Sequence, residues 1–124
     1  MILGIGIDII EVERIASKIS KEAGFRELVF SKKEIEYCEK KTHQFEHYAA
    51  RFAAKEAFLK AAGTGWINGT AFHEIEIMNT EKGKPELVLL GETAVTFQYL
   101  QIKKISVSIS HLKSLASSVV VIEN

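Results

Sequence analysis

Alternation of apolar and small residues predicts strands near both ends of the chain. Residues 2–9 alternate isoleucine with glycine, which predicts a strand with Ile5 and Ile7 on one face. The opposite face then carries Gly4, Gly6 and Asp8. Residues 104–111 and 117–123 predict two more strands, and the first of these has serine at every second position. Because this serine face is small and flat, we expect another surface to pack closely on it.

A helical period replaces the alternation in the first half of the chain. An apolar stripe predicts a helix over residues 11–23, and the stripe consists of Val12, Ile15 and Ile19. Ser31 and Glu34 match a capping box, so a further helix should begin near Lys32. Residues 45–62 are rich in alanine, phenylalanine and long side chains, which predicts a long helix ending at a glycine cap.

The second half of the chain predicts a hairpin beside a short helix. Residues 71–78 and 86–90 predict strands on either side of a turn, with Ile75 and Ile77 facing inward, and residues 92–100 predict a helix. Strands linked by short turns beside separate helices indicate an α+β fold, with a largely antiparallel sheet packed against a long central helix and shorter helices. The length of 124 residues predicts one domain over residues 1–124.

Composition narrows the class of protein. Sixteen basic and sixteen acidic residues give a formal net charge of zero, which removes the main compositional argument for nucleic-acid binding. No apolar run is long enough to span a bilayer, and the N-terminal segment lacks the basic start of a signal peptide. A single cysteine excludes an internal disulfide and is typical of a reducing compartment, so we expect a cytoplasmic protein with no membrane partner.

The charge is unevenly spread along the chain. Six basic residues, Arg14, Lys18, Lys21, Arg26, Lys32 and Lys33, stand against Glu22 and Glu27 in one stretch. A local basic surface on a neutral protein favours an acidic partner, and a solvated helix face is the plainer alternative.

Charged residues in apolar surroundings are the candidates for chemistry. Asp8 lies in an otherwise apolar strand, where a carboxylate is costly to bury unless it binds a cation or several donors. Taken alone, Asp8 is better explained as the cap of the helix that follows it. The long helix carries Arg51, Lys55, Glu56 and Lys60. A surface ion pair is the ordinary explanation of Glu56 and Lys60, but so apolar a helix exposes little surface, and this grouping also suits a metal ion with phosphate oxygens.

The histidines and the N-terminal glycines are weaker signals. His111 ends a strand, where a lone histidine is more often structural or exposed than catalytic. His43 and His47 have the spacing of metal ligands, but no further histidine or cysteine completes a zinc site, and we expect both to be solvated. The Gly4-x-Gly6 pair lacks the third glycine of a dinucleotide-binding fingerprint.

Six segments match, in order, the motifs of one known protein family. They are GIGIDIIEVERI at 4–15, the F-x-x-x-x-F-S-x-x-E run at 25–34, ARFAAKEAFLKAAGTG at 50–65, FHEIEI at 72–77, GKPEL at 83–87 and SISH at 108–111. With these segments the chain resembles the holo-acyl-carrier-protein synthase type of 4′-phosphopantetheinyl transferase. The segments span nearly the whole chain, and RFAAKEAFLKA is highly specific.

The resemblance implies transfer of the 4′-phosphopantetheine group from coenzyme A to a serine of an apo-acyl carrier protein. It implies that Asp8 and Glu56 bind magnesium, or manganese in its place, which reverses the preference for Asp8 as a cap. Lys60 is similar to the family lysine that holds the coenzyme A phosphates. The other segments that line the coenzyme A cleft contain Arg51, Gly63, Thr64, Gly65, Lys84, Pro85 and His111.

The resemblance also implies an assembly and partners. Members of this size are similar in forming homotrimers with each active site between protomers, and a trimer packed through the sheet would cover the serine face. Acyl carrier proteins are acidic, so we expect the carrier to bind a surface made of Arg14, Lys18, Lys21, Phe25 and Arg26, with Phe25 as the apolar anchor. Leu112 and Leu115 depart from the family pattern and leave details of the cleft wall open.

The reaction needs a base for the serine hydroxyl. Glu56, acting through a metal-bound water, is the first candidate and His111 is the second, and the sequence does not separate them. Two functions without catalysis compete with this hypothesis: a coenzyme A or nucleotide-binding module, and a trimeric interaction protein. Loss of a carboxylate or of Lys60 would have favoured the binding module, and Asp8, Glu56 and Lys60 are all present. An interaction protein without a ligand does not account for charges in a helix rich in alanine and phenylalanine.

Overall fold

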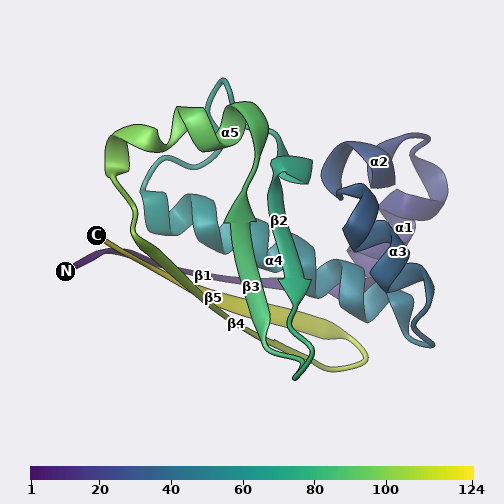
Figure 1. Ribbon diagram of the computed structural model, residues 1–124. Coiled ribbons are helices and arrows are strands. Elements are labelled where there is room, and N and C mark those ends of the chain that lie inside the picture. Colours follow the sequence, from purple (N-terminus) through teal and green to yellow (C-terminus); the bar gives the residue numbers. More distant parts are fainter.

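Two antiparallel sheets pack against one long helix in the computed structural model, which describes residues 1–124 (Figure 1). The helix is α4 (Gln44–Ala62). The larger sheet has the order β1-β5-β4 and is formed by β1 (Ile2–Glu11), β5 (Leu115–Glu123) and β4 (Lys104–His111). The smaller sheet pairs β2 (Ile75–Asn79) with β3 (Pro85–Leu89). This arrangement confirms the α+β fold and the predicted antiparallel pairing.

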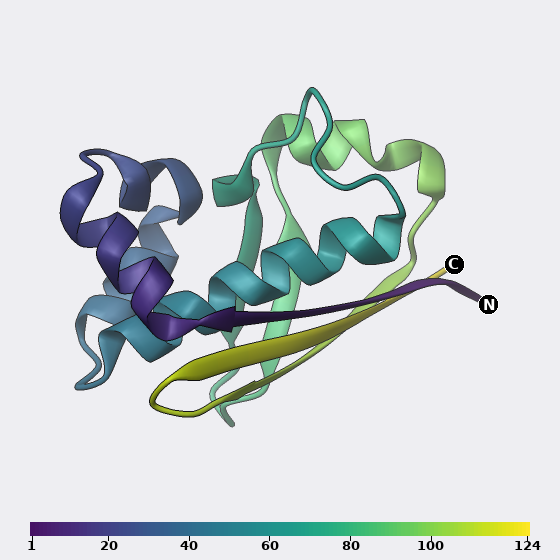
Figure 2. The same ribbon diagram turned by 180° about the vertical axis from the view of Figure 1, so that it is seen from behind.

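Short helices surround the two ends of α4. At its N-terminal end lie α1 (Val12–Lys21), α2 (Phe25–Val29) and α3 (Lys32–Glu39). The hairpin is preceded by η1 (Phe72–Glu74) and followed by α5 (Gly91–Thr96) and η2 (Gln98–Leu100). Figure 2 shows β1 running alongside α4 from the chain terminus to α1. No helix combines the length and the apolar character needed to cross a membrane.

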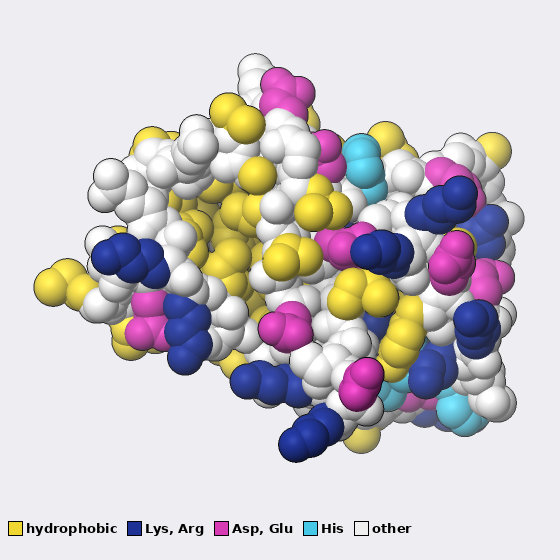
Figure 3. Space-filling view, viewed as in Figure 1, with side chains coloured by type: hydrophobic (Ala, Val, Ile, Leu, Met, Phe, Trp, Pro, Cys, Tyr) yellow, Lys and Arg dark blue, Asp and Glu magenta, His cyan; other side chains and the backbone are white.

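The core is divided into two apolar clusters along α4. The first gathers α1 and α3 around the N-terminal half of the helix and includes Ile15, Cys38 and Tyr48. The second joins its C-terminal half to both sheets and includes Phe58, Ile77 and Val120. Between β3 and the chain before β4 this second cluster stays open to solvent, and Figure 3 shows the apolar floor of the hollow, which measures about 300 Å³.

A glycine face on β1 lets α4 approach the sheet closely. A Cβ atom on Gly6 would overlap the carbonyl oxygen of Ala57, and one on Gly4 would overlap that of Ala61. Only glycine leaves room for the helix backbone at these two positions. The alternate face of β1 is exposed, with Ile5, Ile7 and Ile9 each more than 60% accessible. One strand therefore packs a helix on one face and presents an apolar surface on the other.

A buried ion pair connects the helices to the hairpin. Lys55 is fully buried, and its Nζ donates to Glu34 Oε1 at 2.8 Å and to the carbonyl oxygens of Phe72 at 2.8 Å and Ile75 at 2.6 Å. Glu34 also accepts the backbone N–H of Ile77 at 3.0 Å. Because every charge has partners, the pair fixes α3, α4 and β2 relative to one another.

The local sequence signals are confirmed, with small differences at two elements. The capping box of Ser31 and Glu34 is formed, and α3 begins at Lys32 as predicted. The strand predicted over residues 71–78 begins only at Ile75, because the preceding carbonyl groups turn toward Lys55 and η1 forms instead. The helix predicted over residues 92–100 is divided into α5 and η2, where the buried Phe97 ends the first of them.

Substitution of Gly6 by alanine tests the close approach of α4. We expect Gly6→Ala to lower the free energy of unfolding by about 3 kcal/mol, because the new methyl group overlaps backbone that cannot rotate away. Gly24→Ala is the matched control, since its Cβ meets nothing within 4 Å and only its positive φ of 84° is unfavourable. Chemical denaturation should show a free energy of unfolding for Gly24→Ala that is lower than that of the wild type by about 1 kcal/mol. Equal losses in the two variants would contradict the packing described here.

Candidate active site

Three charged residues meet where α4 crosses β1. Lys60 Nζ lies 3.0 Å from Asp8 Oδ1 and also donates to the carbonyl oxygen of Ile7 at 3.0 Å. The Asp8 side chain is 16% accessible and that of Lys60 is 53% accessible, so the pair lies at the surface where α4 crosses β1. Asp8 does not cap a helix, since β1 continues to Glu11, which occupies the cap position of α1.

Glu56 completes this group, and its pKa reflects the second carboxylate nearby. Burial raises the pKa of Glu56, the negative charge of Asp8 raises it further, and Lys60 acts in the opposite direction. A cation placed beside two neighbouring carboxylates offsets the repulsion between their negative charges. Their oxygen donors, open to water on one side, match the preference of magnesium for one or two carboxylates together with waters and phosphate oxygens. Asp8 and Glu56 therefore fit the metal implied by the resemblance.

A second group lies in a cleft of about 220 Å³ between α4, the hairpin turn and the end of β4. Its lining residues are Tyr37, His47, Ala50, Arg51, Asn79, Gly83, Pro85, Ile109 and His111. Arg51 is 2% exposed, donates to Asn79 Oδ1 at 2.7 Å and stacks 4.2 Å from the ring of Tyr37. Its buried Nε has no hydrogen-bond partner. An unpartnered guanidinium nitrogen at a cleft suits an anionic ligand.

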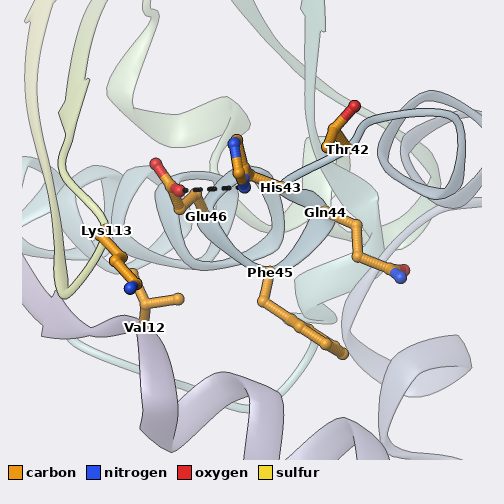
Figure 4. Close-up of a pocket in the computed structure, with 7 residues that line it drawn as sticks. All are labelled: Val12, Thr42, His43, Gln44, Phe45, Glu46 and Lys113. Carbon is orange, nitrogen blue, oxygen red and sulfur yellow. Dashed lines mark ion pairs between the residues drawn. The ribbon is translucent and has the colours of Figure 1, made fainter.

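His111 is held at the edge of this cleft by the first turn of α4. Its Nδ1 lies 2.9 Å from Glu46 Oε1, and its ring packs edge-on against His47 with 5.1 Å between centroids. Burial, followed by the charge of His111, lowers the pKa of His47. His47 is therefore only partly solvated, because Tyr37 and His111 cover its ring, whereas His43 is exposed as expected. Glu46 also borders a neighbouring pocket of about 250 Å³, shown with His43 in Figure 4.

The two groups lie on opposite sides of the chain. Arg51 and Lys60 are nine positions apart, or about two and a half turns, so they point in opposite directions from α4. Asp8 and His111 stand on the two edge strands of the larger sheet, with β5 between them. A single chain therefore does not bring all the predicted site residues around one ligand.

The remaining cleft residues divide between the two groups. Gly63, Thr64 and Gly65 follow the end of α4, so they lie close to Lys60 and about 25 Å along the helix axis from Glu46. These residues therefore belong with Asp8, Glu56 and Lys60 and lie far from Arg51. Lys84 is in the turn between Gly83 and Pro85, is exposed, and its side chain is outside the cleft lining.

The residues of the predicted carrier-binding surface differ in their exposure and in their ion pairing. Arg14 and Lys21 are exposed, whereas Lys18 pairs with Glu22 at 3.4 Å and Arg26 pairs with Glu27 at 2.8 Å. Phe25 is half-buried and packs on the first core cluster. The prominent apolar residue of this surface is instead Leu28, which is 70% exposed on α2. Leu28 could not be predicted from the sequence, because the face that so short a helix exposes depends on its tertiary packing.

Comparison with known proteins identifies close relatives over the whole chain. The chain is 43% identical to the holo-[acyl-carrier-protein] synthase of Solibacter usitatus, covering 100% of both sequences, and 41% identical to that of Geotalea daltonii, covering 99% of each.

Solved structures agree with these relatives. The holo-[acyl-carrier-protein] synthase of Neisseria meningitidis matches with a TM-score of 0.90 at 31% identity, covering 100% of both chains. That of Bacillus anthracis, solved in complex with CoA (3′,5′-ADP), matches with a TM-score of 0.81 at 38% identity, covering 98% of this chain and 96% of the other. The family model described as the 4′-phosphopantetheinyl transferase superfamily matches residues 4–120, and the chain therefore belongs to this superfamily.

Proposed function

We propose that the protein is a holo-acyl-carrier-protein synthase, which transfers the 4′-phosphopantetheine group from coenzyme A to a serine of an apo-acyl carrier protein. The observation that carries this conclusion is the meeting of Asp8, Glu56 and Lys60 in a chain that matches such synthases over its whole length. Relatives from Bacillus anthracis and Helicobacter pylori are solved with coenzyme A, which supports coenzyme A as the substrate. The second product is adenosine 3′,5′-bisphosphate.

Asp8 and Glu56 would hold the magnesium ion of the reaction. When bound, magnesium neutralises charge on the phosphate oxygens and so lowers the barrier to attack by a hydroxyl group. The raised pKa of Glu56 supports this assignment, since its carboxylate lacks a full counter-charge within the chain. Lys60 already reaches Asp8 and has an exposed side chain, so it can turn toward phosphates that approach the two carboxylates.

Arg51 would bind the anionic nucleotide end of coenzyme A. Arg51 lines the cleft and keeps an unpaired Nε, while Asn79 and the ring of Tyr37 hold the guanidinium in place. Pro85 and His111 line the same cleft. An arginine held on two sides binds a phosphate with little loss of conformational entropy.

The separation of the two groups supports an active site between protomers. One coenzyme A molecule that contacts both Lys60 and Arg51 has to bridge two chains, because these residues leave α4 in opposite directions. The outer face of the larger sheet offers the contact surface. It is apolar on β1, through Ile5, Ile7 and Ile9, and small on β4, where Ser108 and Ser110 are exposed. We propose that this face packs in a homotrimer, which would cover the predicted serine face.

The carrier protein would dock beside Asp8. Helix α1 follows β1 directly, so its basic residues stand next to the carboxylate group. Arg14 and Lys21 are free to meet acidic side chains, and Leu28 supplies exposed apolar surface. Lys18 and Arg26, already paired within the chain, would contribute less.

Transfer to an apo-acyl carrier protein tests the function and the metal together. With coenzyme A and magnesium, the carrier should gain the mass of one phosphopantetheine group in mass spectrometry, and a chelator should abolish the gain until magnesium is restored. Glu56→Gln should lower kcat by about 100-fold or more, because the metal loses a charged ligand. Glu86→Gln changes an exposed carboxylate on β3 and should act as wild type. Coenzyme A binding without transfer by the wild-type protein would favour a binding module instead.

A charge on the outer sheet face tests the assembly. Ile7→Glu should convert the trimer to monomers in light-scattering measurements, because a carboxylate cannot be buried at an apolar contact without a partner. Transfer should be lost at the same time, since each chain then holds only half of a site. Val95→Glu is the matched control, with 63% exposure against 64% for Ile7. A monomeric wild type with full activity would overturn the proposed site between protomers.

Charge reversal on α1 tests the docking surface. Arg14→Glu with Lys21→Glu should raise KM for the carrier protein about tenfold at low salt and flatten its salt dependence, while KM for coenzyme A stays constant. Lys40→Glu with Lys103→Glu makes the same charge change at two exposed lysines that lie outside both α1 and the outer sheet face, and it should have little effect. If both double variants behave alike, the carrier binds another surface.

A further inference from the structure

Glu46 is the one charged residue beside the cleft that neither the motifs nor the proposed chemistry uses. It lies in the first turn of α4, is mostly buried with 15% of its side chain accessible, and stands 65 positions from His111 in the sequence. A carboxylate in so enclosed a place needs a partner. Its Oε1 is 2.9 Å from His111 Nδ1, a distance typical of a strong hydrogen bond.

The chemistry of this contact determines the proton on the imidazole. A carboxylate accepts hydrogen bonds and donates none, so Nδ1 of His111 has to carry the hydrogen atom. In the neutral ring, Nε2 on the other side is then the acceptor, and in the charged ring it is a second donor. His111 borders the coenzyme A cleft, while Glu46 borders the pocket behind it (Figure 4).

The other neighbours of Glu46 do not compete for this role. His43 Nδ1 is 3.9 Å from Glu46 Oε2, beyond hydrogen-bond distance, and the His43 side chain is 75% exposed. Lys113 borders the same pocket but forms no ion pair with Glu46. On the far side of His111, the ring of His47 packs edge-on at 5.1 Å and limits rotation of the imidazole.

We propose that Glu46 is a positioning residue of the active site, which fixes the tautomer and orientation of His111 so that Nε2 is available to bound coenzyme A. This inference rests on the proposed function, because it assigns a purpose to a side chain that lines the coenzyme A cleft. Glu46 itself touches no substrate. Its effect passes through His111, in the way that a carboxylate holds the histidine of a hydrolytic triad.

Nitrogen NMR of the histidine rings tests the contact without any turnover. In the wild type, Nδ1 of His111 should show the signal of a protonated nitrogen in the neutral ring, and the signal should be assigned by its loss in His111→Ala. In Glu46→Ala the same ring should become a mixture of tautomers. An unchanged spectrum in Glu46→Ala would overturn the proposal, even if the proposed transfer reaction had failed in every assay.

Steady-state kinetics with a double-mutant cycle test the role. Glu46→Ala should lower kcat/KM for coenzyme A by about 10- to 100-fold, as expected for loss of a hydrogen bond to a charged group, and KM for the carrier protein should not change. The double variant with His111→Ala should be no worse than His111→Ala alone, since both act through one imidazole. Multiplied losses in the double variant would show that Glu46 acts independently of His111.

Two further variants separate positioning from folding. Glu46→Gln keeps the size of the side chain, so its melting temperature should be close to that of the wild type. Its activity should be between those of the wild type and Glu46→Ala, because an amide can form a hydrogen bond with either tautomer of His111. His43→Ala removes the exposed neighbour of Glu46 and should leave activity unchanged. A loss in His43→Ala equal to that in Glu46→Ala would assign the effect to the pocket and not to His111.

Discussion

The close contact between α4 and the glycine face of β1 is the constraint on which both the fold and the site depend. Gly4 and Gly6 let the helix backbone come within van der Waals distance of the strand, and Asp8 is the next residue on the same face. Because the approach is so tight, Lys60 reaches both Asp8 and the neighbouring carbonyl oxygen of the strand. The packing that stabilises the core therefore also brings the Asp8 carboxylate close to Glu56.

The charged side chains of α4 differ in how many of their polar atoms have partners within the protein. This difference distinguishes the structural residue Lys55 from the candidate functional residues. Lys55 has three hydrogen-bond partners and no contact with solvent, so it has no capacity left for a ligand. Arg51 keeps one buried nitrogen unpaired, and Glu56 shares its surroundings with another carboxylate. Groups that a fold leaves unsatisfied in partly buried places are costly unless a ligand completes them.

Local patterns in the sequence predicted most helices and strands, but they could not predict the contacts between segments that are distant in the sequence. The capping box of Ser31 and Glu34 depends on four neighbouring residues and was predicted, but the role of Glu34 as the partner of Lys55 depends on tertiary packing. Asp8 alone resembled a helix cap because the sequence does not show that pairing with β5 continues to Glu11. The metal ligands and cleft residues came from family resemblance, and their separation on the two sides of α4 appeared only in three dimensions.

The alternation along β1 links chemistry to assembly. Side chains of a strand point to opposite faces in turn, so the face with Gly6 and Asp8 would build the proposed metal site while Ile5, Ile7 and Ile9 build the apolar outer surface. A shift of register by one residue would turn the carboxylate outward and the isoleucines against α4. In the proposed assembly half of the coenzyme A contacts would come from a second chain, so the exposed isoleucines would be as necessary to the reaction as the carboxylates. That role would account for an apolar stripe on the outer face of β1, opposite the face that carries Asp8.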